Sequence, residues 1–114
     1  MNDQAIEQEI KAKGLTAPRV TPADIETNII GELYINAGEA ATINGFYPAK
    51  NDPLHLLTFC VLTLRNGFTV TGESACASPE NFDTELGCKI ARANAVNKIW
   101  PLMGYALKEK LHHE

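Results

Sequence analysis

The sequence predicts an α+β fold: a helical N-terminal part, an antiparallel β-hairpin or small sheet, and a C-terminal amphipathic helical segment packed on it. Three observations lead to this prediction. Thr21-Pro22 is typical of a helix start, Asn66-Gly67 separates two runs suited to strands, and apolar residues recur every three or four positions over residues 82–111. With 114 residues, of which 45% are hydrophobic, the chain is expected to form a single domain over residues 1–114.

The first 38 residues predict two helices. Residues 1–20 form an arm with a short helix, because Ile6 and Ile10 lie one turn apart and Gly14 is a common helix stop. Residues 21–38 are predicted as a second helix, with Thr21 as its cap and Gly38 as its stop. The apolar positions of this helix follow the helical period: Ile25, Ile29, Ile30, Leu33, Tyr34 and Ala37.

Residues 39–56 lack a clear period and are predicted to form the main loop, with a turn at Asn44-Gly45. Long loops inside a compact domain are often functional, so Phe46 and Tyr47 are candidates for covering a ligand. The alternative is that both aromatic rings pack at the edge of the core. A short helix starting at Asp52-Pro53 is also compatible with the sequence.

Residues 57–77 are predicted to form a β-hairpin with Asn66 and Gly67 as a two-residue turn, which places Leu64 opposite Thr69. One face then carries Phe59, Val61, Thr63, Phe68 and Val70, and we expect this face to form the core. The other face carries the residues Cys60, Leu62 and Leu64. Because that face is also partly apolar, another element or a second copy of the chain should cover it, which predicts a homo-oligomer.

Residues 78–111 are predicted to form the C-terminal helical segment, with Ser78 as the cap and Pro79 at the first position. Pro101 removes one helical hydrogen bond, so we expect two helical pieces joined near Trp100. The predicted buried stripe consists of Phe82, Leu86, Ile90, Ala93, Val96, Trp100, Met103, Leu107 and Leu111.

Composition argues against several classes of partner. A formal charge of −4 and a pI near 5.3 disfavour DNA or RNA, whose binding needs clustered Lys and Arg. No run is long enough for a membrane span, and an N-terminus with Asp3, Glu7 and Glu9 is unlike a signal peptide. We therefore expect a cytoplasmic protein that does not bind membranes.

The sequence does not indicate catalytic or metal chemistry. The three cysteines have no C-x-x-C spacing, so reduced thiols and no metal site are expected. A dyad of His55 with Cys60 or Cys76 would combine residues that show no other sign of catalysis. We therefore expect a protein that is not an enzyme and carries no cofactor.

Several segments, in this order and spacing, resemble the phage and prophage family called the gene product 49 / gene 66 family. They are Asn66-Gly67-Phe68, Ser74-Ala75-Cys76, Ser78-Pro79-Glu80-Asn81-Phe82-Asp83, and Ile99-Trp100-Pro101-Leu102 with Gly104-Tyr105. The resemblance implies a small phage-encoded accessory protein without a known enzymatic reaction, acting in the cytoplasm of the bacterial host. More distantly, the chain is similar to the Thoeris anti-defence sponge proteins, which sequester cyclic nucleotide-type immune signals made by the host.

Two hypotheses follow from the resemblance. In the first, the chain sequesters a cyclic nucleotide or ADP-ribose-type signal; its candidate residues are Arg65, Lys89 and Arg92 for phosphate and Phe46, Tyr47 and Phe82 for base stacking. These cations are equally compatible with an ordinary solvated helix face. In the second, the chain is a modulator that docks an apolar face on a host protein.

Overall fold

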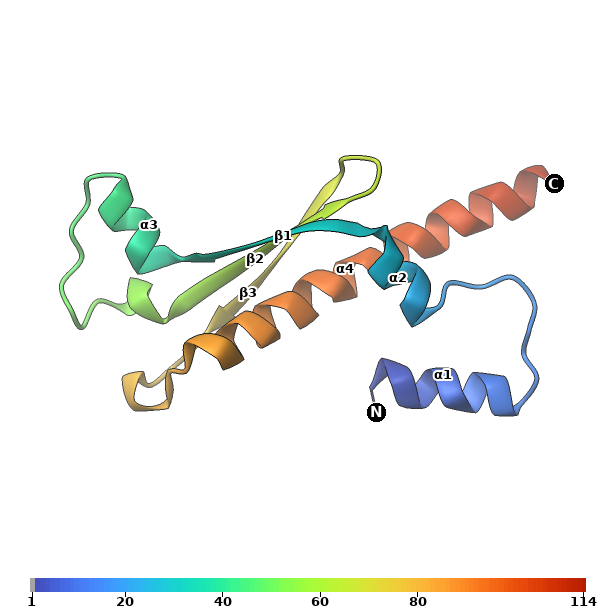
Figure 1. Cartoon of the computed structure of the whole chain (residues 1–114), viewed down its shortest axis with the longest axis horizontal. Helices are drawn as coiled ribbons and strands as arrows, with labels where there is room; N and C mark the ends of the chain where they lie inside the picture. Colours follow the sequence, from blue (N-terminus) through green and yellow to red (C-terminus); the bar gives the residue numbers. More distant parts are fainter. Residues whose placement is uncertain (1) are drawn as a thin grey trace.

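A computed structural model describes residues 2–114 of the chain. Its centre is a three-stranded antiparallel sheet in the order β1-β2-β3, formed by β1 (Ile29–Asn36), β2 (Leu57–Leu64) and β3 (Thr69–Ala75). The long helix α4 (Thr84–His113) packs across β3 and β2 on one face of this sheet (Figure 1). The predicted α+β fold, with a C-terminal helix packed on a small sheet, is confirmed.

The N-terminal arm contains helix α1 (Asp3–Ala12), and its helix stop is confirmed, because Gly14 has a φ of 68°. Met1, the first residue of the predicted arm, lies outside the described residues. Helix α2 (Pro22–Asn28) begins as predicted. The Thr21 hydroxyl accepts a hydrogen bond from the Asp24 amide at 3.1 Å, and the Asp24 carboxylate accepts one from the Thr21 amide at 2.9 Å.

The predicted helix over residues 21–38 is wrong beyond Asn28, because the chain then enters strand β1. Its apolar residues fit the spacing of a helix, but the β-branched Ile29, Ile30 and Ile35 also favour an extended chain, and Gly31 disfavours a helix interior. Pairing with β2, far along the sequence, decides between the two. A new helix, α3 (Ala37–Ile43), starts where the predicted helix would have stopped.

The predicted loop over residues 39–56 is only partly irregular. It begins inside α3 and ends in a short 3₁₀ helix, η1 (Pro53–Leu56). The Asp52 carboxylate caps η1 by accepting a hydrogen bond from the Leu54 amide at 2.9 Å. The short helix that Asp52-Pro53 made possible is therefore present.

The hairpin turn differs from the predicted one. The Leu64 amide donates to the Phe68 carbonyl at 2.8 Å, and the Gly67 amide donates to the Leu64 carbonyl at 2.8 Å. The loop is therefore the three residues 65–67, with Gly67 at a φ of 90°. This shifts the pairing by one residue, so that Thr63, and not Leu64, lies opposite Thr69.

The shift in register changes which face of the hairpin forms the core. Val70 lies opposite Leu62 and joins the face of Cys60 and Leu64, and these four side chains are between 0% and 6% exposed. The prediction that the face with Phe59, Val61 and Thr63 forms the core is wrong. This face lies on the other side of the sheet from the buried residues, and its three side chains are only half-buried.

Small residues of α4 face the sheet. Gly87, Ala91 and Ala95, followed by Ile99, are buried at intervals of four residues and form one line along the helix. They let the helix approach the sheet closely over Gly72 of β3. The prediction of a buried apolar stripe along residues 82–111 is wrong at its beginning. Leu86 and Ile90, which it includes, are 53% and 43% exposed. Residues from its middle do pack against the core: Val96, Trp100 and Met103.

The start of α4 also differs from the prediction. Ser78 makes no capping hydrogen bond and instead precedes a short 3₁₀ turn, η2 (Pro79–Asn81). The Asp83 carboxylate caps α4 by accepting from the Leu86 amide at 2.9 Å. The predicted break near Trp100 is wrong, since α4 continues through Pro101. One missing hydrogen bond is tolerated because the flanking turn, with Ile99 and Trp100, packs on the core.

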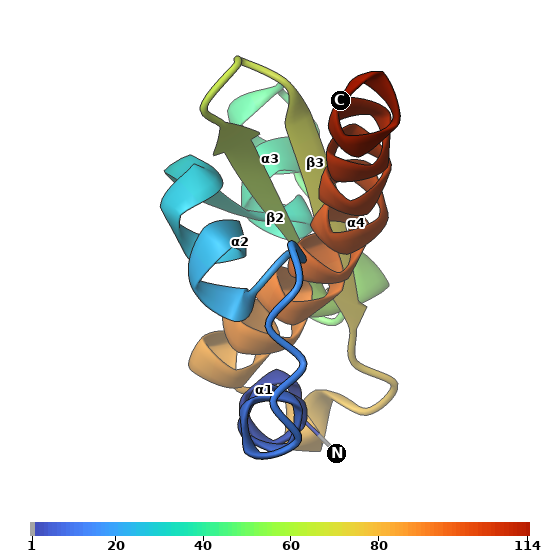
Figure 2. The ribbon, with the colours of Figure 1, turned by 90° about the vertical axis from the view of Figure 1, so that its right-hand side faces the viewer.

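The fold is long and narrow, with extents of 56 × 29 × 17 Å. The C-terminal end of α4 projects beyond the sheet, and α1 lies beside the middle of α4 (Figures 1 and 2). None of the helices within residues 2–114 combines the length and the apolar character that crossing a bilayer requires.

Candidate ligand-binding site

A hollow with a volume of about 470 Å³ lies where the α1–α2 linker, the end of α2, the hairpin loop and the end of α4 meet. Figure 2 views the molecule from this end. The volume falls in the range usual for small-molecule sites. Its lining residues are Arg19, Val20, Asp24, Thr27, Asn28, Arg65, Met103, Ala106, Leu107 and Lys110.

Arg65 is the one predicted site residue that lines this hollow. Its backbone amide donates to the Asn28 carbonyl at 2.9 Å, and its guanidinium Nη2 donates to the Thr27 carbonyl at 3.1 Å. These bonds fix the hairpin loop against the end of α2. A guanidinium carries five N–H donors, so further donors of Arg65 remain to bind an anion.

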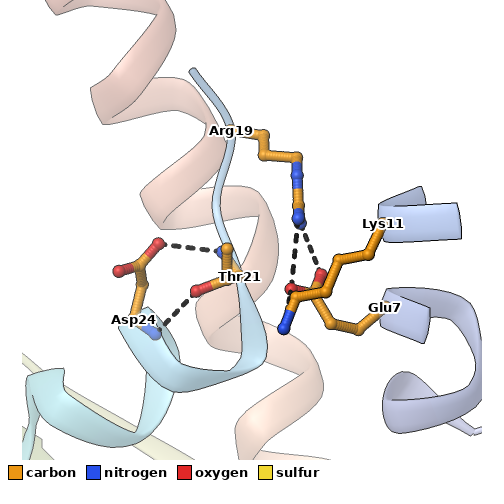
Figure 3. Close-up of polar contacts among 5 residues, drawn as sticks. All are labelled: Glu7, Lys11, Arg19, Thr21 and Asp24. Atoms are coloured by element: carbon orange, nitrogen blue, oxygen red, sulfur yellow. Dashed lines mark hydrogen bonds and ion pairs between the residues drawn. The ribbon is translucent and has the colours of Figure 1, made fainter. Parts of the chain in front are cut away.

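Arg19 lies on the linker and forms a bidentate ion pair with Glu7 of α1 (Figure 3). This hydrogen bond from Arg19 lowers the pKa of Glu7, and the same bond raises the pKa of Arg19. The pair ties α1 to the linker beside the capping box of Thr21 and Asp24. Much of the positive charge of Arg19 is therefore already balanced.

Lys110 contributes the third cation, from the last turns of α4. Within residues 2–114 it takes part in no ion pair. Asp24 is the one acidic residue of the lining, and its carboxylate accepts from the Thr21 amide. In a chain with 10 basic and 14 acidic residues, this hollow thus has an excess of positive charge.

A second hollow of about 280 Å³ adjoins the first and shares Asn28, Met103 and Ala106 with it. Phe68 lines this second hollow and is 55% exposed. The two hollows together place cations, an amide and an exposed aromatic ring at one end of the molecule. This combination is suited to a ligand with an anionic group and a flat ring.

The structure does not bring the other predicted cations to this site. Lys89 is an exposed side chain of α4 that pairs with Glu85 at 3.3 Å. Arg92 bonds Glu26 of α2 and Glu32 of β1, with shortest distances of 2.7 and 2.8 Å. Its hydrogen bonds lower the pKa of both carboxyl groups, and they raise the pKa of Arg92 itself. Arg92 therefore joins three elements of the fold, which leaves it little capacity for a ligand.

The predicted aromatic residues are also dispersed. Phe46 and Tyr47 lie between α3 and η1 at the other end of the molecule and are 71% and 81% exposed (Figure 1). Phe82 is half-buried in a small hollow of about 130 Å³ beside the start of α4. The six predicted site residues therefore do not form one site. Arg65 alone among them lines the hollow of about 470 Å³.

In the structure, His55 and Cys60 each make contacts that do not fit a catalytic dyad. The His55 ring packs against Gly38 of α3, and its Nε2 lies 3.0 Å from the Ala49 carbonyl oxygen. Cys60 is fully buried in the core, and this burial raises the pKa of its thiol, which disfavours the reactive thiolate. Residues 2–114 contain no group of three or more His, Cys, Asp or Glu placed to hold a metal ion.

Comparison with protein families identifies a match. The model of the phage protein (N4 Gp49/phage Sf6 gene 66) family matches residues 20–111, which is most of the chain. The chain belongs to this phage protein family. No significant similarity is found to a curated protein or to a solved structure.

The region matched by the family includes most of the large hollow, with Arg19 lying just before it. Sequence reasoning missed Arg19, Lys110, Thr27 and Asn28. Lys110 lies in the predicted helical segment 78–111 and continues the spacing of Met103 and Leu107, but no motif around it indicates a ligand. Asn28 lay within a predicted helix, whereas it ends α2 and faces the hairpin loop. Of these four residues, Lys110 was the one whose place could have been found from the sequence, because the helical spacing continues to it.

Proposed function

We propose that this member of the N4 Gp49/phage Sf6 gene 66 family is a non-enzymatic accessory protein that binds and sequesters a small anionic nucleotide-type ligand in the hollow at Arg65 and Lys110. The observation that supports this most is the position of Arg65 and Lys110 beside about 470 Å³ of space in an acidic chain. The cytoplasm of the infected host is where such a ligand would be removed.

Binding of the anionic group is proposed to involve Arg65 and Lys110. Arg65 is held by its bond to the Thr27 carbonyl, so little side-chain entropy is lost when it binds a phosphate. Lys110 approaches from α4 and adds a second charge. Hydrogen bonds between charged partners are the stronger class, and phosphate oxygens are suitable acceptors.

The rest of the ligand is proposed to lie over the apolar surface shared by the two hollows. Met103 and Ala106 line both, and the exposed Phe68 ring offers a face for stacking a base. The Asn28 side-chain carbonyl accepts from the Arg65 amide at 3.2 Å, so its NH₂ group is available to donate. Among the residues that line the two hollows, none carries a thiol or an imidazole, which favours binding over catalysis.

The proposed ligand class rests on the resemblance to the Thoeris anti-defence sponge proteins that the sequence suggests. The probes are therefore cyclic mononucleotides, cyclic dinucleotides and cyclic ADP-ribose, titrated into the full chain by isothermal calorimetry, with inorganic phosphate as a minimal anion. We expect heat and a rise in Tm with at least one nucleotide. The proposal is overturned if no probe gives either signal.

Three substitutions localise the binding. Arg65→Gln and Lys110→Gln should each weaken binding about tenfold, since each removes a charge-assisted hydrogen bond. Phe68→Leu should weaken it about fivefold by removing the stacking face. Lys89→Gln is the matched control, because it removes an exposed positive charge of α4 that does not line either hollow. A loss with Lys89→Gln as large as with Arg65→Gln would contradict the proposed site.

A second candidate function is a modulator that docks on a host protein. The observation that favours it is an exposed apolar tip formed by Ile43, Phe46 and Tyr47, which are 85%, 71% and 81% exposed. Aromatic residues exposed in this way are enriched where proteins bind each other. A host protein recovered in stoichiometric amount with the full chain, and lost with a Phe46→Ser/Tyr47→Ser variant, would favour this function. Tyr105→Ser, which alters a ring that is 72% exposed on α4, is the control.

A further inference from the structure

On the face of the sheet opposite α4, strands β1 and β2 present mainly apolar side chains, and no helix packs along this face. Strand β3 contributes Thr69, Thr71 and Glu73 to it. Because paired residues point to the same side, Leu33 of β1, Val61 of β2 and Thr71 of β3 share this face, and Ile35 and Phe59 extend it. We call these five residues the open face. Leu33 is 56% exposed, and Thr71 is exposed as well.

The other elements of the chain are engaged elsewhere. Helix α4 packs on the opposite side of β2 and β3, α2 contacts β1 and α4, and α3 contacts η1, β1 and β2. A sheet with one bare apolar face is unusual in a chain of this size, because that face is normally covered or polar. Something outside this copy of the chain is therefore needed to cover it.

The total exposed surface is compatible with one missing interface. A monomer of this mass usually exposes about 6,100 Å², whereas this chain exposes 7972 Å². The difference is about 1,800 Å², and a standard protein interface removes about 800 Å² from each partner. The radius of gyration of 17.8 Å also indicates an extended molecule, because about 13 Å is usual at this length. The exposed area in excess of a compact monomer is therefore larger than the area that one partner buries in a standard interface.

The charge distribution favours a second copy over an unrelated partner. The centre of the open face, at Leu33, Val61 and Thr71, contains no ionisable residue. Glu73 points to the same side, because it is paired with Phe59, but it lies on the edge strand β3. A two-fold interface places the same patch on both sides, so a charged centre would repel itself, while an uncharged apolar centre is self-complementary.

We propose that two copies of the chain pack open face against open face, so that the two sheets form the inside of a homodimer. Each α4 then lies on an outer surface. The hollow at Arg65 and Lys110 lies on the α4 side of the sheet, so it stays accessible in both copies. The dimer is therefore independent of the proposed ligand.

Analytical ultracentrifugation of the full chain over a concentration series tests this proposal. The wild type should sediment at twice the chain mass. Leu33→Lys should raise the dimer dissociation constant at least about 30-fold, because it places a charge in the centre of the interface. The monomer should fold normally with this lysine, since Leu33 is already 56% exposed, and circular dichroism would check this.

Two further variants complete the test. Thr71→Lys alters an exposed residue of the same face and should also favour the monomer. Tyr105→Lys introduces the same charge on the projecting part of α4 and should leave the dimer intact. A wild type that remains at the mass of one chain at high concentration would overturn the proposal. So would a dimer that Tyr105→Lys dissociates while folded Leu33→Lys and Thr71→Lys do not.

Discussion

Gly72 of β3 and Ala95 of α4 meet at backbone distance: a Cβ atom on Gly72 would lie 2.3 Å from the Ala95 nitrogen. The same atom would lie 2.2 Å from the Ala91 carbonyl oxygen. Both neighbours are backbone atoms, which cannot turn aside as a flexible side chain can. The contact therefore determines how closely the long helix approaches the sheet.

Gly72→Ala is expected to destabilise the protein by about 3 kcal/mol or more, because the helix must move away from the sheet and lose packing along its buried line. Urea denaturation followed by circular dichroism measures this loss. Gly104→Ala is the matched control. Nothing lies within 4 Å of the added methyl group there, and alanine in a helix should increase stability by about 0.5–1 kcal/mol. Equal effects of the two substitutions would contradict the close packing.

Arg92→Met should reduce stability at pH 7 by about 1 kcal/mol, a modest value because Glu26 and Glu32 are partly exposed. The loss should depend on pH. Arg92 holds the pKa of both carboxyl groups below the ordinary 4.5, so their contribution is present above pH 4.5 and disappears as pH falls through the lowered values. Urea denaturation from pH 7 to pH 3 should show the two proteins converging in acid.

Lys89→Met is the control for this prediction, because it removes a cation from a simple surface pair with Glu85. It should change stability by less than about 0.5 kcal/mol. A constant difference between Arg92→Met and the wild type at all pH values would show that the lost stability comes from packing of the arginine stem.

Gly38→Ala should destabilise the end of the sheet by about 1–3 kcal/mol, because the added methyl group would lie 2.1 Å from Nδ1 of His55. The double variant Gly38→Ala/His55→Ala should recover part of this stability, since it removes the ring that clashes. Thermal denaturation of the single and double variants gives the coupling between the two positions. Additive losses would contradict direct contact.

Cys60 should react with a thiol reagent only after unfolding, because it is 0% exposed and its thiol pKa is raised by burial. Cys76 and Cys88 are half-buried and should react in the native protein at a measurable rate. Counting labelled thiols by mass spectrometry with and without urea tests this. Native labelling of Cys60 at the rate of Cys88 would contradict its place in the core.

Helix starts and the overall class of the fold follow from local chemistry, and the sequence predicts them well. Thr21 and Asp24 form a capping box within four residues, and Gly14 ends a helix through its own backbone conformation. Such signals do not depend on distant parts of the chain. The α+β class follows because each type of element is indicated locally.

Strand β1 and the buried line of α4 depend on distant partners, and the sequence alone does not determine them. Ile29 and Leu33 fit a helix as well as a strand until pairing with β2 is known. On α4, the large apolar residues suggest the wrong face, because close approach to Gly72 selects alanine and glycine over leucine. A hydrophobic period identifies a helix but does not show which of its faces can come closest to a sheet.

The candidate site was predictable only through Arg65. Its place beside the hairpin turn is local, but its neighbours Arg19 and Lys110 come from opposite ends of the chain. The sequence gives no indication that these three residues converge. Conversely, Arg92 looked available as a helix cation and is instead bonded to Glu26 and Glu32, which lie more than 50 residues away.

Trp100, the one tryptophan of the chain, lies where α1 meets α4, and its indole Nε1 donates to the Asp3 carboxylate at 3.3 Å. Together with Ile6 and Ile10 of α1, Trp100 lines a hollow of about 230 Å³ between the two helices. Fluorescence emission from this indole is therefore a natural reporter of whether the N-terminal arm is docked. Detachment of the arm would shift the emission to longer wavelength, while the far-ultraviolet dichroism of the sheet and α4 would stay nearly constant. The two signals therefore follow the N-terminal arm and the rest of the fold separately in one sample.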